Sequence, residues 1–172
     1  MLFRSGLFGK QNLYEFGGMH VPLVIAGPGI PKGRTDALVY LMDLYPTLAE
    51  LAGANPPRTI EGRSLGPILH GQATTVRPVL YTAYRDCQRS IRDDRWKLIR
   101  YPLVDVTQLF DLAEDPHELT NLATDPKQAP KVAELMRRLA EEMAAYGDQT
   151  PLTVARPAPA AWSPPTKTGR KK

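Results

Sequence analysis

The chain has 172 residues, 42% of them hydrophobic, which is enough for one domain of ordinary size with a core. A single cysteine, Cys87, excludes an internal disulfide framework and a metal site built from several cysteines. Five of the 22 basic residues and no acid follow residue 150, so the rest of the chain is near neutral despite the formal charge of +4. This distribution does not indicate a nucleic-acid-binding protein, and no apolar run approaches the ~20 residues that span a bilayer.

The N-terminal part contains a lysine preceded by a glycine, and then an apolar run. Lys10 follows Gly9, and the run Val21–Ala26 ends at Gly27. The run is rich in β-branched residues and does not alternate with polar ones. It therefore predicts a strand buried on both faces, as in parallel sheets.

Leucines at helical spacing predict a helix in the next segment: Leu41, Leu44, Leu48 and Leu51. Pro46 is tolerated in the first turn of a helix, so the helix is expected to start near Asp43 or Leu44. Gly53 stands where a C-terminal cap belongs. Residues 64–69 predict one further helical turn.

The second half of the chain consists of short segments separated by turns that contain Asp, Pro or Gly. These segments predict antiparallel strands at Val79–Tyr84, Gln88–Arg92, Arg95–Tyr101 and Gln108–Leu112. The tightest hairpin turn is expected at the acidic pair Asp93-Asp94.

The C-terminal part predicts one amphipathic helix and a tail. Apolar residues recur at helical spacing over Lys131–Tyr146, with Glu134 and Arg138 paired on the polar face and Gly147 as the stop. Residues 148–172 are rich in proline, alanine and basic residues and predict a disordered tail. We therefore expect a small antiparallel sheet with one helix laid across it.

Few residues carry a specific chemical signal by themselves. Lys10, on its glycine-flanked loop, can act as a point charge for a tetrahedral anion such as sulfate or phosphate. Spacing alone favours the simpler interpretation of a solvent-exposed loop lysine. The three histidines lie far apart in the sequence and lack a second ligand at metal-binding spacing, so each is interpreted as a surface or hydrogen-bonded residue: His20, His70 and His117.

The thiol and the acidic groups have structural interpretations. Cys87 has basic neighbours but falls at the start of a predicted strand, where a small buried side chain is expected rather than a nucleophile. A hairpin turn explains Asp93 and Asp94 without catalysis. The acidic residues around Pro116 are interpreted as turn residues with helix-start signals: Asp111, Glu114, Asp115 and Glu118.

Seven motifs together resemble the C-terminal half of a type I sulfatase, a member of the arylsulfatases and the alkaline phosphatase superfamily. They occur in the order of that family over roughly residues 6–145. The motifs are LFGKQNLYE (7–15), VPLVIAGPGI (21–30), DLYPTL (43–48), EGRSL (61–65), IRDDRWKLI (91–99), LFDL (109–112) and DPHELTNLA (115–123).

The resemblance implies an α/β fold in three parts. Residues 1–77 would be the end of an alkaline-phosphatase-like sheet and of an incomplete catalytic domain. Residues 78–147 would form a small C-terminal subdomain of antiparallel strands packed on one helix, ahead of the tail at 148–172. In this family the lysine at the position of Lys10 contacts the substrate sulfate, where its charge offsets that of the sulfuryl oxygens.

The resemblance also implies two features that the motifs do not supply. Sulfatases use a cysteine or serine within Cys/Ser-x-Pro/Ala-x-Arg, converted to formylglycine, and an early Asp-Asp pair that holds calcium. Cys87 does not fit the first pattern. Asp93-Asp94 lies in the predicted hairpin and not at the metal position.

We therefore expect a C-terminal fragment of a sulfatase that is inactive alone, because the nucleophile and calcium ligands of the complete enzyme are missing. The expected substrate of the parent enzyme is a sulfated small molecule or polysaccharide, with no nucleic-acid partner and no membrane span. The family implies a periplasmic, secreted or lysosomal location, although the first residues do not match a signal peptide. The alternatives are a fragment of a phosphate or phosphonate ester hydrolase, and a non-catalytic binding module derived from the subdomain.

Overall fold

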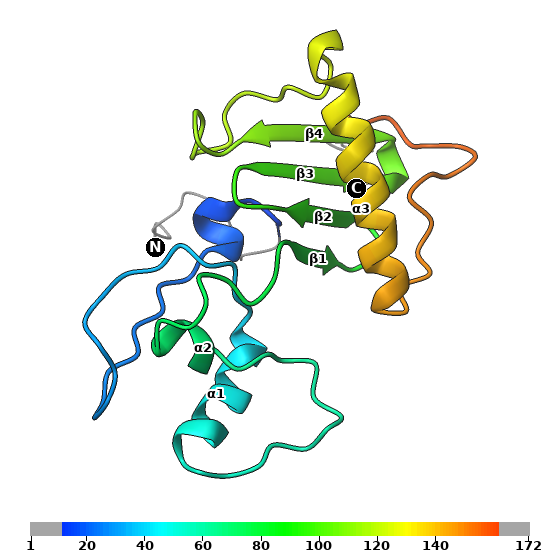
Figure 1. Cartoon of the computed structure of the whole chain (residues 1–172). Helices are drawn as coiled ribbons and strands as arrows, with labels where there is room; N and C mark the ends of the chain where they lie inside the picture. The colour runs from blue at the N-terminus through cyan, green and yellow to red at the C-terminus, as the bar shows by residue number, and fades with distance from the viewer. Residues whose placement is uncertain (1–11, 162–172) are drawn as a thin grey trace, which may run out of the picture.

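Four strands form the centre of the computed structural model, which describes residues 12–161. They are β1 (Leu80–Tyr84), β2 (Gln88–Arg92), β3 (Trp96–Tyr101) and β4 (Val106–Asp111), and each is antiparallel to the next in the order β1-β2-β3-β4 (Figure 1). The four strands predicted from the sequence are confirmed, with ends that shift by no more than two residues.

The hairpin between β2 and β3 has the predicted turn. The carboxylate of Asp93 accepts hydrogen bonds from the backbone N–H groups of Arg95 (3.0 Å) and Trp96 (2.6 Å). An aspartate that bonds its own backbone two or three residues on forms a turn without help from the rest of the fold. This explains why the local sequence was sufficient to place the turn.

One face of the sheet is covered by α3 (Ala129–Ala145), which crosses the strands in Figure 1. The predicted amphipathic helix is confirmed, and Gly147 ends it with a positive φ of 69° that a glycine adopts easily. The core under α3 takes Ile91, Leu98 and Leu109 from β2, β3 and β4, whose side chains alternate between the two faces of the sheet. It also takes Leu135, Leu139 and Met143 from α3, and Val79 from the position just before β1.

The opposite face of the sheet is covered by the N-terminal segment. Side-chain alternation along β3 and β4 turns Ile99 and Phe110 away from α3, and Leu13 packs against both of them. Leu13 is only 3% exposed. The chain then enters η1 (Glu15–Met19), a π-helical turn. The sheet therefore lies between the C-terminal helix and residues from the start of the described chain.

A small helical part precedes the sheet. It contains η2 (Leu41–Asp43), α1 (Leu44–Leu51) and α2 (Gly66–Leu69), and Figure 1 shows it beside the β1 edge. The predicted helix and the later helical turn are both confirmed. The Tyr40 hydroxyl joins this part to β1, since it donates to the Tyr81 carbonyl (2.8 Å) and accepts from the Tyr81 N–H (2.6 Å).

Asp43 holds the helical part together. Its carboxylate is fully buried and accepts hydrogen bonds from the backbone N–H groups of Tyr40 (2.7 Å) and Arg63 (2.8 Å). The guanidinium of Arg77 contacts both carboxylate oxygens, at 2.6 Å for the Nη2–Oδ1 pair. A buried carboxylate is stable only with such a full set of donors.

The prediction of a strand at Val21–Ala26 is wrong for residues 12–161, which the structure describes. The segment is extended but pairs with no strand among residues 12–161, and Val24 is 87% exposed. The apolar residues of η2 and α1 behave similarly, because both helices are present but Leu41 of η2 and Leu48 of α1 are 65% and 59% exposed. A strand needs a neighbour to receive its backbone hydrogen bonds, and a sequence pattern does not supply one.

The first part of the predicted tail folds back onto the sheet. Asp148 forms an ion pair with Arg89 of β2 (2.6 Å), and the Leu152 carbonyl accepts from Arg100 of β3 (2.8 Å). The N–H of Ala158 donates to the Leu103 carbonyl (2.8 Å). Residues 148–158 thus differ from the disordered tail that their composition indicates.

Candidate functional site

Lys10, the predicted sulfate contact, lies outside the residues that the structure describes, so its role stays a prediction. The structure does describe the segment that follows it. Asn12–Met19 begins two residues after Lys10 and is held against the sheet by buried apolar, polar and charged contacts. The contacts of this segment therefore define the candidate site.

Leu13 and Tyr14 fix the start of the segment. Leu13 is buried between β3 and β4, and the Tyr14 ring packs on Phe110 with 6.0 Å between centroids. The Tyr14 hydroxyl donates to Gln108 Oε1 (2.8 Å), and the Tyr14 N–H donates to Asn12 Oδ1 (3.0 Å). Packing thus orients Leu13, and both packing and directional bonds orient Tyr14.

The turn η1 closes tightly because of Gly18. The N–H groups of Met19 and His20 donate to the carbonyls of Tyr14 (2.9 Å) and Glu15 (3.0 Å). A Cβ on Gly18 would lie 2.6 Å from Asn12 Oδ1 and 2.7 Å from the Asn12 carbonyl oxygen. Only a glycine fits this contact between the turn and the residue near Lys10.

Glu15 is held on the sheet by Arg92, Lys97 and Glu118. These four residues are named here the buried charged cluster. Lys97 Nζ donates to Glu15 Oε1 (3.0 Å) and lies 2.9 Å from Glu118 Oε1. The Glu15 backbone N–H donates to Glu118 Oε2 (2.5 Å). Arg92 Nε is 3.6 Å from Glu15 Oε1, close enough for an ion pair but too far for a hydrogen bond.

The cluster is shielded from water and balanced in charge. The side chains of Lys97 and Glu118 are 1% and 0% exposed, and that of Glu15 is 13% exposed. Two cations face two carboxylates, which is the condition for burying them together. Burial raises the pKa of Glu118 above its ordinary value, while the charge of Lys97 opposes the shift.

The backbone at Glu118 adopts a left-handed conformation with φ of 56°. Residues other than glycine rarely adopt this conformation. They keep it only where surrounding contacts hold the backbone in it. At Glu118 those contacts are the ones with Lys97 and with the N–H of Glu15. The acidic stretch around Pro116 was interpreted as turn chemistry, and this buried role was missed.

Sequence reasoning also missed Glu15 and Lys97. The available signal was the apolar run of β3, where Lys97 stands between Trp96 and Leu98 at a position that alternation places on the same face as Ile99. A lysine on a covered face of a sheet requires a buried acidic partner. Nothing in the local pattern identifies that partner.

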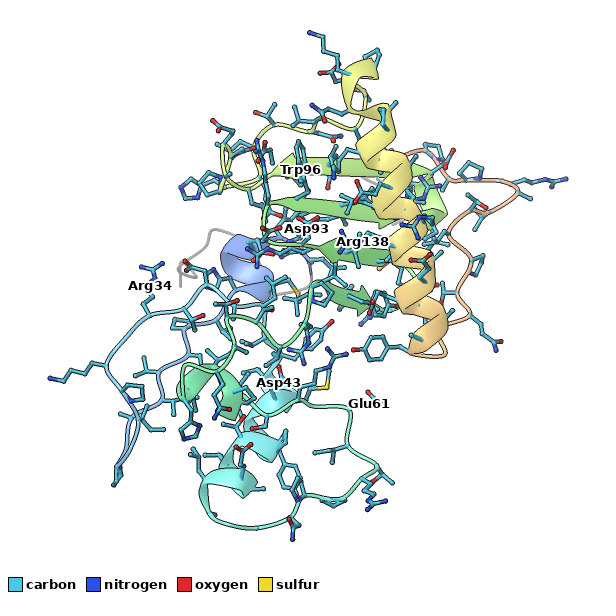
Figure 2. The ribbon with its side chains drawn as sticks, viewed as in Figure 1. Arg34, Asp43, Glu61, Asp93, Trp96 and Arg138 are labelled. Atoms are coloured by element: carbon cyan, nitrogen blue, oxygen red, sulfur yellow. The ribbon has the colours of Figure 1, made fainter. Side chains whose placement is uncertain are left out.

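The other candidates do not form a reactive site in the structure. The half-buried Cys87 thiol donates to the Tyr84 carbonyl (3.3 Å), as a small structural side chain does. Asp93 serves the hairpin turn and pairs with Arg138 of α3 (3.2 Å), both labelled in Figure 2. His70 Nδ1 lies 2.8 Å from the Gly66 carbonyl oxygen, and His20 is exposed.

A calcium site does not fit residues 12–161. In that range no three His, Cys, Asp or Glu side chains come together in a way that would hold a metal ion. The carboxylates with clear roles face cations or backbone N–H groups instead. Asp111, for example, is bound by Arg95 (2.9 Å), and that guanidinium is the main cause that holds the pKa of Asp111 below its ordinary value.

Among the residues that the structure describes, no helix has the length and apolar character needed to cross a membrane.

Comparison with known proteins identifies the family. Residues 4–145 match the family model described as N-sulphoglucosamine sulphohydrolase, C-terminal. The chain is 41% identical to a choline-sulfatase of Rhizobium meliloti over 134 residues, covering 74% of this chain and 26% of that enzyme. It is 37% identical to arylsulfatase K of Xenopus laevis over 148 residues, covering 77% and 27% of the two chains.

A solved structure gives the same fold. The phosphonate monoester hydrolase from Silicibacter pomeroyi superposes with a TM-score of 0.70 at 27% identity, covering 83% of this chain and 32% of that one. The chain spans about a quarter of the length of the curated relatives named above. Its four-stranded sheet and helix are the C-terminal subdomain expected from the sequence. Since the family model covers most of its residues, the chain belongs to the sulfatase family, in the region described as N-sulphoglucosamine sulphohydrolase, C-terminal.

Proposed function

We propose that this chain supplies the C-terminal part of an enzyme that hydrolyses sulfate esters, and that Lys10 contacts the sulfate group. The observation that carries the proposal is the rigid attachment of Leu13, Tyr14 and Glu15 to the sheet, immediately after the Gly9-Lys10 pair. A lysine only three residues before such an anchor can present its ammonium at a fixed place. A preorganised cation stabilises charge on sulfuryl oxygens better than a mobile one.

The proposed enzyme needs further groups beyond Lys10. In the complete enzyme a formylglycine would supply the nucleophile, and calcium would supply charge neutralisation at the sulfate group. Residues 12–161 contain no cluster suited to calcium. We therefore propose that the chain contributes the lysine and its supporting subdomain, and does not turn over sulfate esters alone.

The exposed apolar residues support a larger catalytic domain. Val24 and the apolar side chains of α1, such as Leu48, face solvent in the structure. Monomeric proteins seldom expose apolar side chains over two adjoining segments without a partner surface. We propose that Val21–Ala26 and α1 are covered by the rest of the α/β domain in the complete enzyme.

The substrate class is proposed from the relatives. Choline-sulfatase and arylsulfatase K are the names of two relatives, so a sulfated small molecule or polysaccharide is the proposed substrate. The phosphonate monoester hydrolase favours a second candidate, in which the same C-terminal region serves a phosphonate or phosphate ester hydrolase. A non-catalytic binding module derived from the subdomain is the third.

A chimeric enzyme tests these proposals. The C-terminal region of the Rhizobium meliloti choline-sulfatase that matches this chain is replaced by residues 1–172, and hydrolysis of choline sulfate and of a phosphonate monoester is measured. We expect sulfate ester hydrolysis, a fall in kcat of at least about a hundredfold for Lys10→Met, and no change for Lys32→Met, an exposed control lysine.

The outcomes separate the candidates. Preference for the phosphonate monoester would favour the second candidate. A folded chimera with no hydrolysis of either ester would favour the binding module. A Lys10→Met chimera as active as its parent would exclude the proposed role of Lys10, and sulfate ester turnover by the 172-residue chain alone would exclude the proposed division of the site.

A further inference from the structure

We infer that Lys97 is a positioning residue for Lys10: it joins Glu15 and Glu118 in the buried charged cluster and so fixes the segment that follows the proposed sulfate-binding lysine in the sequence. The inference rests on the proposed function of Lys10. It adds a role for three residues, Lys97, Glu118 and Glu15, that are not proposed to touch the substrate.

Lys97 is held in a rigid element of the sheet. It lies in β3, which pairs with β2 on one side and β4 on the other, so its backbone is bonded along both edges. Its Nζ reaches Glu15, 82 residues earlier, at 3.0 Å. The N-terminal segment is thus tied to the centre of the sheet rather than to a loop.

Two kinds of contact, apolar and charged, hold the segment that follows Lys10. Leu13 supplies apolar packing, which allows small sliding movements because it has no preferred direction. The cluster adds bonds that do have a direction: the Lys97 ammonium holds the carboxylate of Glu15, and Glu118 holds its backbone N–H. Together they specify where the backbone of Glu15 lies and how it is oriented.

Only a short stretch of chain separates Lys10 from the buried Leu13. Leu13 is three residues after Lys10, and each intervening residue has only two soft backbone dihedrals. An anchor this close along the chain restricts the positions that Lys10 can reach. Gly18 reinforces it, because the η1 turn closes onto Asn12.

The members of the buried charged cluster lie in motifs of the family. Three of the motifs that mark the family each supply members of the buried charged cluster: Glu15 ends the first, Arg92 and Lys97 lie in IRDDRWKLI, and Glu118 lies in DPHELTNLA. Segments that are distant in sequence therefore meet at one buried point that includes Glu15, five residues after Lys10 in the sequence.

The test uses the 172-residue chain and two readouts. Amide hydrogen exchange is followed at Tyr14, Glu15, Met19 and His20, whose N–H groups donate hydrogen bonds in the structure, with α3 as internal reference. Binding of inorganic sulfate is followed by NMR shifts of the Gly9-Lys10 amides, with Lys10→Met to identify the specific signal.

Two variants and one control are compared with the natural chain. Lys97→Met removes the central cation. The triple variant Glu15→Gln, Lys97→Met and Glu118→Gln removes every charge that Lys97 joins while it keeps similar shapes, so no carboxylate is left without its lysine if the single variant fails to fold. Lys131→Met is the matched control, because it breaks a more exposed lysine–glutamate pair on α3 (2.6 Å).

We expect both cluster variants to accelerate exchange at the four reporter amides by at least about tenfold relative to α3. We expect them to weaken sulfate binding by at least about fivefold, with Lys131→Met unchanged in both readouts. A triple variant with natural exchange at the reporter amides would overturn the inference. So would a variant that releases these amides yet binds sulfate as the natural chain does.

The proposed function fails in a different way. If sulfate causes no Lys10-dependent shift in the natural chain, the sulfate contact is wrong and the positioning role falls with it, whatever the exchange rates are. If the natural chain binds sulfate through Lys10 and the cluster variants do not disturb that binding, only the role of Lys97 is wrong.

Discussion

Arg77 binds the buried carboxylate of Asp43 with both terminal nitrogens, across 34 residues of sequence. The pair joins the end of η2 to the segment just before β1, so the helical part and the sheet depend on it together. Burial, the largest effect, raises the pKa of Asp43, but hydrogen bonds from Arg77 and two backbone N–H groups outweigh it and leave the pKa below its ordinary value.

We expect Asp43→Asn to lower the free energy of unfolding by about 3 kcal/mol, because it leaves a buried guanidinium without its counter-charge. Urea unfolding at neutral pH measures the change. Asp36→Asn is the control, since the Arg34–Asp36 pair is exposed on a loop, and Figure 2 shows Arg34 well away from Asp43. An equal effect of the two substitutions would contradict the structural role of Asp43.

A second prediction concerns η1, the turn that follows Lys10 in the sequence. Gly18→Ala places a methyl group against Asn12, so we expect a loss of about 2 kcal/mol and faster amide exchange at Met19 and His20. Gly33→Ala is the matched control, because a Cβ there meets no atom within 4 Å. If Gly18→Ala is as stable as the control, the close approach to Asn12 does not exist in solution.

A third prediction concerns acid stability. Burial, the largest effect, would raise the pKa of Asp148, but hydrogen bonds from Arg89 and its neighbours outweigh it and hold the pKa well below its ordinary value of 3.8. A carboxyl with a depressed pKa in the folded state binds fewer protons than in the unfolded state. Its stabilisation is therefore present above about pH 4 and is lost as the pH falls towards its folded pKa.

Urea unfolding at a series of pH values tests this sign. The natural chain should lose stability progressively below about pH 4, and Asp148→Asn should be less stable at pH 7 with a flatter dependence in the acid range. Glu118→Gln serves as the contrast, because the raised pKa of Glu118 contributes in the opposite direction, with stability lost as the pH rises above 4.5. An unchanged acid slope in Asp148→Asn would rule out its ion pair.

A fourth prediction concerns the segment after α3. A chain ending at Gly147 loses the partner of Arg89, whose side chain is 4% exposed, and we expect a loss of about 2 kcal/mol. A chain ending at Ala161 keeps the contacts of Asp148, Leu152 and Ala158 and should unfold like the natural chain. Equal stability of the two truncated chains would mean that residues 148–158 are a tail, as their composition indicates.

Local chemistry determined several elements of this protein. Asp93 forms its turn with backbone groups two and three residues away, and α3 follows from the spacing of Leu135, Leu139 and Met143, which needs no knowledge of the partner face. The resemblance that identified the family also came from the sequence, because the motif residues follow one another in the expected order. It provided the prediction for Lys10.

Only the tertiary structure decided whether the apolar run Val21–Ala26 pairs as a strand and which residues form the buried charged cluster. Val21–Ala26 has the composition of a buried strand, but pairing requires a neighbouring strand, which residues 12–161 do not provide. Lys97 and Glu118 look like a strand lysine and a turn acid until the fold brings both to Glu15, over separations of 82 and 103 residues. A charge can be buried only beside its partners, and which residues become partners is decided by the fold.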